Sequence, residues 1–177
     1  MHETLTHQVS LGNGRRRLLF HRLPPGGGPG ADLPTHDLAV RQSDRHLHDQ
    51  RAGGDGIDAA RGIVRGSRAT DNLGAGITTT DGRVWDSVAS GNGSDGILGS
   101  GTANVIQGNI VQANLGVGVH ITSGIATLIG NTVSGNLVGL DAGLEGAGLS
   151  QNVIKGNGTN LYGSIRQLPP GSNFFGR

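Results

Sequence analysis

Hydrophobic and polar positions recur with a period of about 21 residues from position 56 onward. A Gly followed by Ile, Val or Leu opens five successive repeats, at spacings of 20, 20, 22 and 21 residues. These steps are Gly56-Ile57, Gly76-Ile77, Gly96-Ile97, Gly118-Val119 and Gly139-Leu140. Two further apolar columns and two polar columns keep the same phase. Chance could supply one such column but not five, so the chain has a repeat architecture.

The apolar residues within each repeat alternate with a strand period. Pairs such as Ile77/Thr79 and Val119/Ile121 are two residues apart, which places both side chains on one face of a strand. Helical repeats have periods of roughly 33 residues or longer, so they do not fit. A period near 21 fits three short strands per repeat, each repeat forming one coil of a parallel β-helix. Coils stack about 4.8 Å apart, and we expect five to six of them.

Two polar columns are predicted to form ladders of amide hydrogen bonds along the axis. An Asn side chain can donate to the coil on one side and accept from the coil on the other. We also expect these Asn residues, together with the Gly beside them, to adopt the left-handed conformation of a sharp corner. The columns are Ser67, Ser87, Asn109, Asn131 and Asn152, and Asn72, Asn92, Asn114, Asn136 and Asn157.

The apolar columns predict which side chains point inward. One column is Val64, Val84, Ile106, Leu128 and Leu149, and the other is Ala69, Ala89, Val111, Val133 and Ile154. Inward volume grows along the second column, so the first coils should be the less stable end. Thr132, next to inward Val133, should point outward.

The first 52 residues lack this pattern. They contain six of the seven His, seven of the thirteen Arg and no Ile, and they have no hydrophobic period. Residues 35–50 have the apolar spacing of a weak helix capped by Thr35. We therefore expect a disordered or weakly helical extension at 1–52, a β-helix domain at 53–168 and a C-terminal tail at 169–177.

Composition and charge exclude several classes. The chain has 34 Gly among 177 residues and no Cys, which excludes a disulfide scaffold and Cys-based metal sites. A formal net charge of +1 gives no long-range field toward nucleic acid, so no nucleic-acid partner is expected. No apolar run approaches the ~18 residues of a membrane span, and Leu18-Leu19-Phe20 is too short for an export signal.

Three segments resemble the right-handed parallel β-helix repeat proteins of the pectate-lyase-like superfamily. They are Gly-Asn-Ile-Val-Gln-Ala-Asn at 108–114, Gly-Asn-Thr-Val-Ser-Gly-Asn at 130–136 and Gln-Asn-Val-Ile-Lys-Gly-Asn at 151–157. The resemblance covers about 56–165. It implies an all-β, right-handed fold, a polysaccharide partner and an extracellular or cell-surface location. Enzymes of this superfamily act on acidic polysaccharides with carboxylates, a basic residue or bound calcium on one exterior strand face.

The outward residues after each Gly-apolar step are therefore candidates for a site. They are Asp58, Thr78, Leu98, His120 and Asp141. His120 and Asp141 should be one coil apart, and Asp95 lies in the corner before Gly96. A His beside a carboxylate can act as a base near neutral pH, so His120, Asp141 and Asp95 are the candidate catalytic residues. The alternative is that they are isolated charges on a solvated surface.

Trp85 and Arg65 are the candidate substrate-binding residues. Trp85 should point outward beside Arg65 and Gln107, where an indole ring could stack on a sugar. The alternative is that Trp85 packs under the N-terminal segment. No cofactor is expected. No metal is expected either, because Gly53-Gly54-Asp55-Gly56-Ile57-Asp58 is a single copy of a calcium-binding repeat, and calcium needs six to eight ligands.

Two function classes remain open from the sequence. The first is a secreted or cell-surface β-helix that binds or processes polysaccharide, as a lyase or glycoside hydrolase if it is an enzyme. The second is a non-catalytic structural or adhesive rod, alone or as part of a longer protein. An enzyme should have acids and a base clustered in a groove, and the sequence offers only one small candidate cluster. We therefore favour a chain without catalytic activity. The ligand and the oligomeric state are left open.

Overall fold

The computed structural model describes residues 38–39, 48–50, 53–169 and 171–176. The chain divides into two units, 1–31 and 32–177, and all the described residues belong to the second. Within these ranges the structure consists of strands and turns without a helix, so it contains no helix long and apolar enough to cross a bilayer. This confirms the predicted all-β class.

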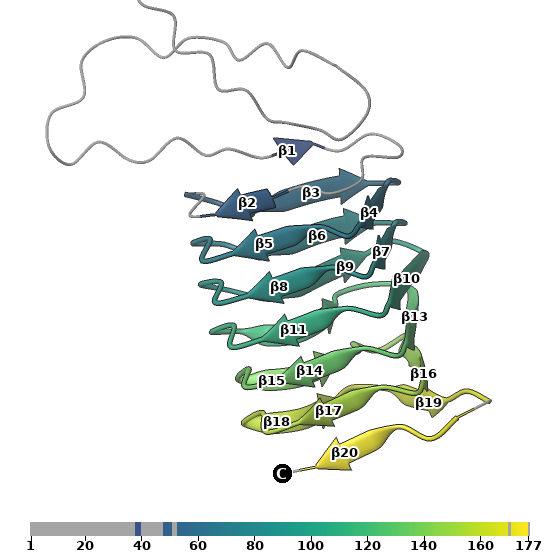
Figure 1. Cartoon of the computed structure of the whole chain (residues 1–177). Coiled ribbons are helices and arrows are strands. Elements are labelled where there is room, and N and C mark those ends of the chain that lie inside the picture. The colour runs from purple at the N-terminus through teal and green to yellow at the C-terminus, as the bar shows by residue number, and fades with distance from the viewer. Residues whose placement is uncertain (1–37, 40–47, 51–52, 170, 177) are drawn as a thin grey trace, which may run out of the picture. The chain divides into compact units, whose positions relative to one another are not determined.

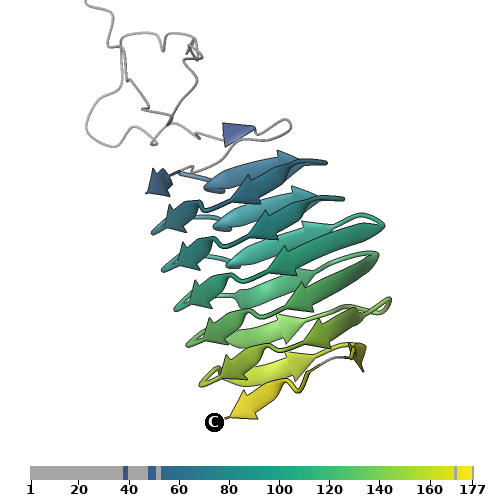
Figure 2. The ribbon, with the colours of Figure 1, turned by 45° about the vertical axis from the view of Figure 1, so that its right-hand side comes forward.

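Short strands assemble into three parallel sheets that wind around one interior (Figures 1 and 2). Sheet A contains β1 (Leu38–Ala39), β3 (Ile57–Ala60), β6 (Ile77–Thr80), β9 (Ile97–Ser100), β12 (Val117–Ile121), β15 (Val138–Asp141) and β18 (Thr159–Tyr162). Sheet B contains β4 (Ile63–Arg65), β7 (Arg83–Trp85), β10 (Ala103–Gln107), β13 (Ile125–Ile129), β16 (Ala147–Ser150) and β19 (Ile165–Gln167). Sheet C contains β2 (His48–Gln50), β5 (Arg68–Thr70), β8 (Val88–Ser90), β11 (Ile110–Gln112), β14 (Thr132–Ser134), β17 (Val153–Lys155) and β20 (Phe174–Gly176).

Each repeat contributes one strand to each sheet, as the 21-residue period predicts. The chain runs from sheet A to sheet B to sheet C and then returns to sheet A one coil further on. The six strands of sheet B in the described residues correspond to six coils. The prediction of five to six coils is therefore confirmed.

The predicted inward columns line the interior and match from coil to coil. Val133 pairs in register with Val111 and with Ile154, and all three side chains are fully buried. Ala69 and Ala89 occupy the same column in earlier coils and are also fully buried. Aliphatic stacking of equivalent residues therefore forms the core.

Both predicted Asn ladders are present. The first ladder is the column from Asn72 to Asn157. In it, Asn92 Nδ2 donates to Asn114 Oδ1 at 2.8 Å, and Asn114 Nδ2 donates to Asn136 Oδ1 at 2.9 Å. In the second, Asn131 Nδ2 donates to Asn152 Oδ1 at 2.9 Å. Each Asn oxygen also accepts from the backbone of the preceding coil, as at Asn92 N. The ladders thus satisfy polar groups that the narrow interior shields from water.

The predicted left-handed conformation of the ladder Asn residues is wrong. The positive φ angle belongs instead to the residue just before each ladder position. In the first ladder these residues are Asp71, Gly91, Ala113, Gly135 and Gly156, with φ between 55° and 68°. Because the chain turns one residue earlier, the Asn side chain itself can point inward along the axis.

Three strands lie outside the bounds 53–168 that the sequence predicts for the β-helix domain. Leu38–Ala39 and His48–Gln50 lie in the segment expected to be disordered or weakly helical, yet they are strands that pair with β3 and β5. Phe174–Gly176 lies in the expected tail and pairs with β17. In each case hydrogen bonds to the edge of a neighbouring coil decide the structure, and local sequence contains no signal for them. The rest of 1–52 lies outside the described residues.

Candidate functional site

An outward column runs along sheet A and contains two of the candidate residues. The strand register places Asp58 beside Thr78, Thr78 beside Leu98, and Leu98 beside His120. His120 pairs in turn with Asp141, and Asp141 with Tyr162. The order predicted from the sequence is therefore correct, and His120 and Asp141 lie on neighbouring strands of the same face.

Asp95 joins this column from the corner before β9. Its Oδ2 lies 2.8 Å from His120 Nδ1, and its Oδ1 accepts from Val117 N at 2.7 Å. The Asp95 side chain is 13% exposed and that of His120 is 30% exposed. Asp95 therefore fixes the ring of His120 from the preceding coil. With the proton on Nδ1, that N–H donates to Asp95 and leaves Nε2 as an acceptor for a ligand.

The same bridge occurs two coils earlier without a His. Asp55 Oδ1 accepts from Ala75 N at 2.7 Å, and its Oδ2 accepts from Thr78 Oγ1 at 2.8 Å. An Asp at this corner thus links the backbone and an outward side chain of the next coil wherever it occurs in the described residues. The hydrogen bonds of Asp95 are therefore explained by this structural role, without a catalytic one.

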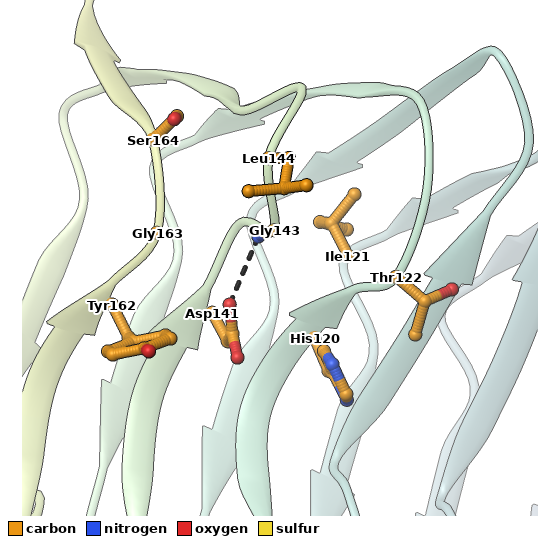
Figure 3. A pocket seen from close by; sticks show the side chains of 9 residues that line it. All are labelled: His120, Ile121, Thr122, Asp141, Gly143, Leu144, Tyr162, Gly163 and Ser164. Carbon is orange, nitrogen blue, oxygen red and sulfur yellow. Dashed lines mark hydrogen bonds between the residues drawn. The ribbon is translucent and has the colours of Figure 1, made fainter.

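A depression of about 420 Å³ lies beside His120 and Asp141 (Figure 3). The turn between β15 and β16 forms one wall, and Asp141 Oδ1 accepts from Gly143 N in that turn at 3.0 Å. Tyr162 lines the depression from the following coil and is 67% exposed, whereas His120 lines it from the preceding coil. The depression is lined by His120, Ile121, Thr122, Asp141, Gly143, Leu144, Tyr162, Gly163 and Ser164.

Tyr162 was missed as a candidate by the sequence analysis. It belongs to the same outward column as Asp141, one coil further on. The Gly-apolar steps end at Gly139-Leu140, because Asn160 precedes Leu161 where the earlier coils have Gly. Leu161, which pairs with Leu140, was the available signal, since the residue after it must point outward.

The second pair of candidates lies on sheet B. Trp85 pairs in register with Arg65 and with Gln107, as predicted, and is partly exposed. Arg65 Nε lies 3.6 Å from Asp86 Oδ2. Arg83 places its guanidinium 5.7 Å from the centre of the Trp85 ring, a cation–π contact that the sequence did not reveal. The alternative that Trp85 packs under the N-terminal segment concerns residues outside the described ranges.

The candidate metal ligands of the described ranges do not gather at one place. No group of three or more His, Asp or Glu residues there is arranged to hold an ion. The Asp55 carboxylate of the calcium-like segment is already engaged by Ala75 N and Thr78 Oγ1.

Solved structures with the same fold include three proteins named for polysaccharide chemistry. Pectate lyase Pel9A has a TM-score of 0.58 and 16% identity, over 72% of this chain and 45% of that one. The periplasmic alginate epimerase AlgG has a TM-score of 0.57 and 17% identity, over 80% and 38%. The mannuronan C-5 epimerase AlgE4 A-module of Azotobacter vinelandii has a TM-score of 0.50 and 14% identity, over 75% and 52%.

At these identities the likeness shows the fold, and this chain spans between 38% and 52% of the length of those proteins. No curated protein sequence matches it significantly. The family model described as the right handed beta helix region matches residues 39–164, which is most of the chain. The protein therefore belongs to the right-handed β-helix family.

Proposed function

We propose that this chain binds polysaccharide along the outer face of sheet A, at the depression beside His120, Asp141 and Tyr162. One observation above all supports the proposal. Three polar or aromatic side chains in one register column line a depression that opens to solvent. An exposed Tyr ring beside hydrogen-bonding groups is suited to a sugar, which has apolar faces and a rim of hydroxyl groups.

The fold neighbours support the ligand class. Pectate, alginate and mannuronan, named for the three similar structures, are all polysaccharides. A column with a spacing of about 4.8 Å per coil also presents repeated contacts to an extended polymer. The proposal includes an extracellular or cell-surface location; one neighbour is named as periplasmic, which is likewise outside the cytoplasm.

The proposal assigns binding rather than turnover. Glycoside hydrolysis uses two carboxyl groups, one as acid and one as base or nucleophile. Asp95 is engaged by both of its oxygens, in the same geometry as Asp55, which leaves Asp141 as the carboxylate at the depression. His120 could still serve as a base, so turnover is an outcome that the experiment must measure.

A structural or adhesive rod is the second candidate. It is favoured by the ladders, which continue from Asn152 to Asn173 and so extend into the last described coil. For a rod of this kind the outer face of sheet A would need no ligand. The two candidate functions therefore predict different effects on polysaccharide binding when an outward side chain of sheet A is removed.

A binding panel with matched variants tests the proposal. Wild-type protein would be titrated with soluble neutral, amino and uronate polysaccharides, and each mixture would be assayed for new reducing ends and for unsaturated products. Tyr162→Ala should weaken binding about tenfold or more, because stacking contributes strongly to sugar affinity. Phe174→Ala is the control, since Phe174 is an aromatic residue of the last coil that is 57% exposed on sheet C.

Binding that Tyr162→Ala weakens and Phe174→Ala preserves would support the proposal. Absence of binding to every polymer would contradict it and favour the rod. Binding that both variants weaken equally would contradict the location on sheet A. New reducing ends or unsaturated products would replace binding by catalysis at the same face, provided that Tyr162→Ala removes them.

A further inference from the structure

The sheet A site is lined by one carboxylate, Asp141, and by no Lys or Arg. We infer that it selects uncharged or amino polysaccharides over polyuronates, an inference that rests on the proposed binding at this face. Pectate and alginate are polymers of uronic acids, so a site for them needs positive charge. The sheet A site of this chain has the opposite character, as the distribution of charged residues shows.

Charged residues divide between the sheets in the described coils. From β3 to β18, the strands of sheet A contain Asp58 and Asp141 and no Lys or Arg. The strands of sheet B contain no Asp or Glu and three Arg, at 65, 83 and 166. Asp55 and Asp95 add further carboxylates at the corner that leads into sheet A. The outer face of sheet A is therefore acidic, whereas that of sheet B is basic.

The depression itself follows this pattern. Among its nine lining residues, Asp141 is the one carboxylate and none is Lys or Arg. His120 cannot reverse the sign, because it is paired with Asp95 at 2.8 Å. When His120 is neutral, the pair carries the charge of Asp95. When it is protonated, the pair is neutral overall. In both states the site has a net negative charge, because Asp141 adds its own.

The hydrogen-bonding groups of the depression also favour uncharged or amino polysaccharides over polyuronates. Asp141 offers a carboxylate, and His120 with its proton on Nδ1 offers Nε2 as an acceptor. Tyr162, Thr122 and Ser164 have hydroxyl groups, which donate or accept as needed. Sugar hydroxyl and ammonium groups can donate to these acceptors. A uronate carboxylate is itself an acceptor and would face Asp141 as a like charge.

Pairs of polymers that share a backbone and differ in the charge of their substituents test the inference. Polygalacturonate would be compared with its methyl ester, and carboxymethyl cellulose with hydroxyethyl cellulose, by calorimetric titration of wild-type protein. We expect the uncharged member of at least one pair to bind about tenfold or more tightly than the charged member, because like-charge contact opposes binding. Raising the NaCl concentration should narrow the difference, since salt screens the repulsion.

Asp141→Asn is the variant that isolates the charge. It keeps the shape of the side chain and removes the carboxylate, so the affinity for the charged member should rise toward that for the uncharged member. Arg83→Gln on sheet B is the control. It removes a charge of the opposite sign from a different face and should leave this selectivity unchanged.

The outcomes separate this inference from the proposed function. Preference for the charged polymers, lost in Tyr162→Ala, would overturn the inference and leave binding at sheet A standing. Preference for the uncharged polymers that Asp141→Asn does not change would overturn the electrostatic cause. Absence of binding to every polymer would overturn both. Preference for uncharged polymers that Asp141→Asn narrows and Arg83→Gln does not would support both.

Discussion

The interior and the exterior of the coils are built from the same strands but follow different rules. Inside, equivalent residues stack from coil to coil, as Val111, Val133 and Ile154 do. Outside, the equivalent position changes from Leu98 to His120 in adjacent coils. An inward side chain must fit its counterparts above and below, whereas an outward one meets solvent.

This difference indicates where to look for function in a repeat protein. The interior explains most of the Gly, Asn and aliphatic content, because each column must pack or pair with itself. Residues that the repeat itself does not require lie on the outside, at positions where the residue type differs from that of the equivalent position in other coils. His120, Asp141 and Tyr162 are such residues, and they adjoin a depression that the turn between β15 and β16 creates.

The largest expected effect comes from a charge placed inside. Val133→Asp should destabilise the fold by several kcal/mol, about 3 or more, because an unpaired carboxylate would replace a fully buried methyl pair. Thr132→Asp, on the exposed side of the same strand, should change stability by about 0.5 kcal/mol or less. Urea denaturation of both variants measures the difference, and equal losses would contradict the observed strand register.

A smaller loss is expected from breaking one ladder. Asn131 accepts from Asn109 N and Nδ2, each at 3.0 Å, and donates to Asn152 Oδ1 and to the carbonyl of Ile106. Asn131→Ala leaves buried groups without partners, so we expect a loss of about 2–3 kcal/mol. Gln112→Ala removes an exposed outward amide on sheet C as the control. If the two amides have the same effect on the urea midpoint, the ladder does not stabilise the interior.

The smallest change in stability is expected at the corner between interior and exterior. Ala113 has a φ of 55°, while Gly91 and Gly135 occupy the same corner of the adjacent coils. Ala113→Gly should stabilise by up to about 1 kcal/mol, because Gly adopts this conformation without strain. Gly135→Ala should destabilise by a similar amount, since a Cβ there has space but not a favoured φ. Thermal unfolding of both variants checks the sign, and shifts in the same direction would rule out this cause.

Most of the interior could be predicted from the sequence, and the reason is physical. Inward columns repeat because coils stack directly, so the period alone identified Val64, Val84 and Ile106 as one buried column. The left-handed conformation was expected at the ladder Asn as well as at the Gly beside it, because both residue types favour turns, and only the preceding residue adopts it. Strands β1, β2 and β20 were missed because their structure depends on pairing with a neighbouring coil rather than on their own pattern.

The exterior could be predicted only in part. Register alone identified His120 and Asp141 as neighbours. The contact between Asp95 and His120 also depends on the direction of a corner side chain, which a repeat pattern does not specify. The depression and its wall depend on a turn that occurs in one coil, and the contact of Arg83 with Trp85 on rotamers. Periodicity does not encode features that occur once.

The chain contains one Tyr and one Trp, and they report on different faces. Tyr162 lies on sheet A beside the depression, and Trp85 lies on sheet B beside Arg65 and Arg83. An NMR titration of protein labelled at Tyr and Trp, with a polysaccharide that binds, follows both rings in one experiment. The account predicts that the Tyr162 ring signals shift in proportion to binding while the Trp85 indole signal does not move. A shift of Trp85 with Tyr162 unchanged would contradict binding at sheet A and would assign the ligand to the basic face.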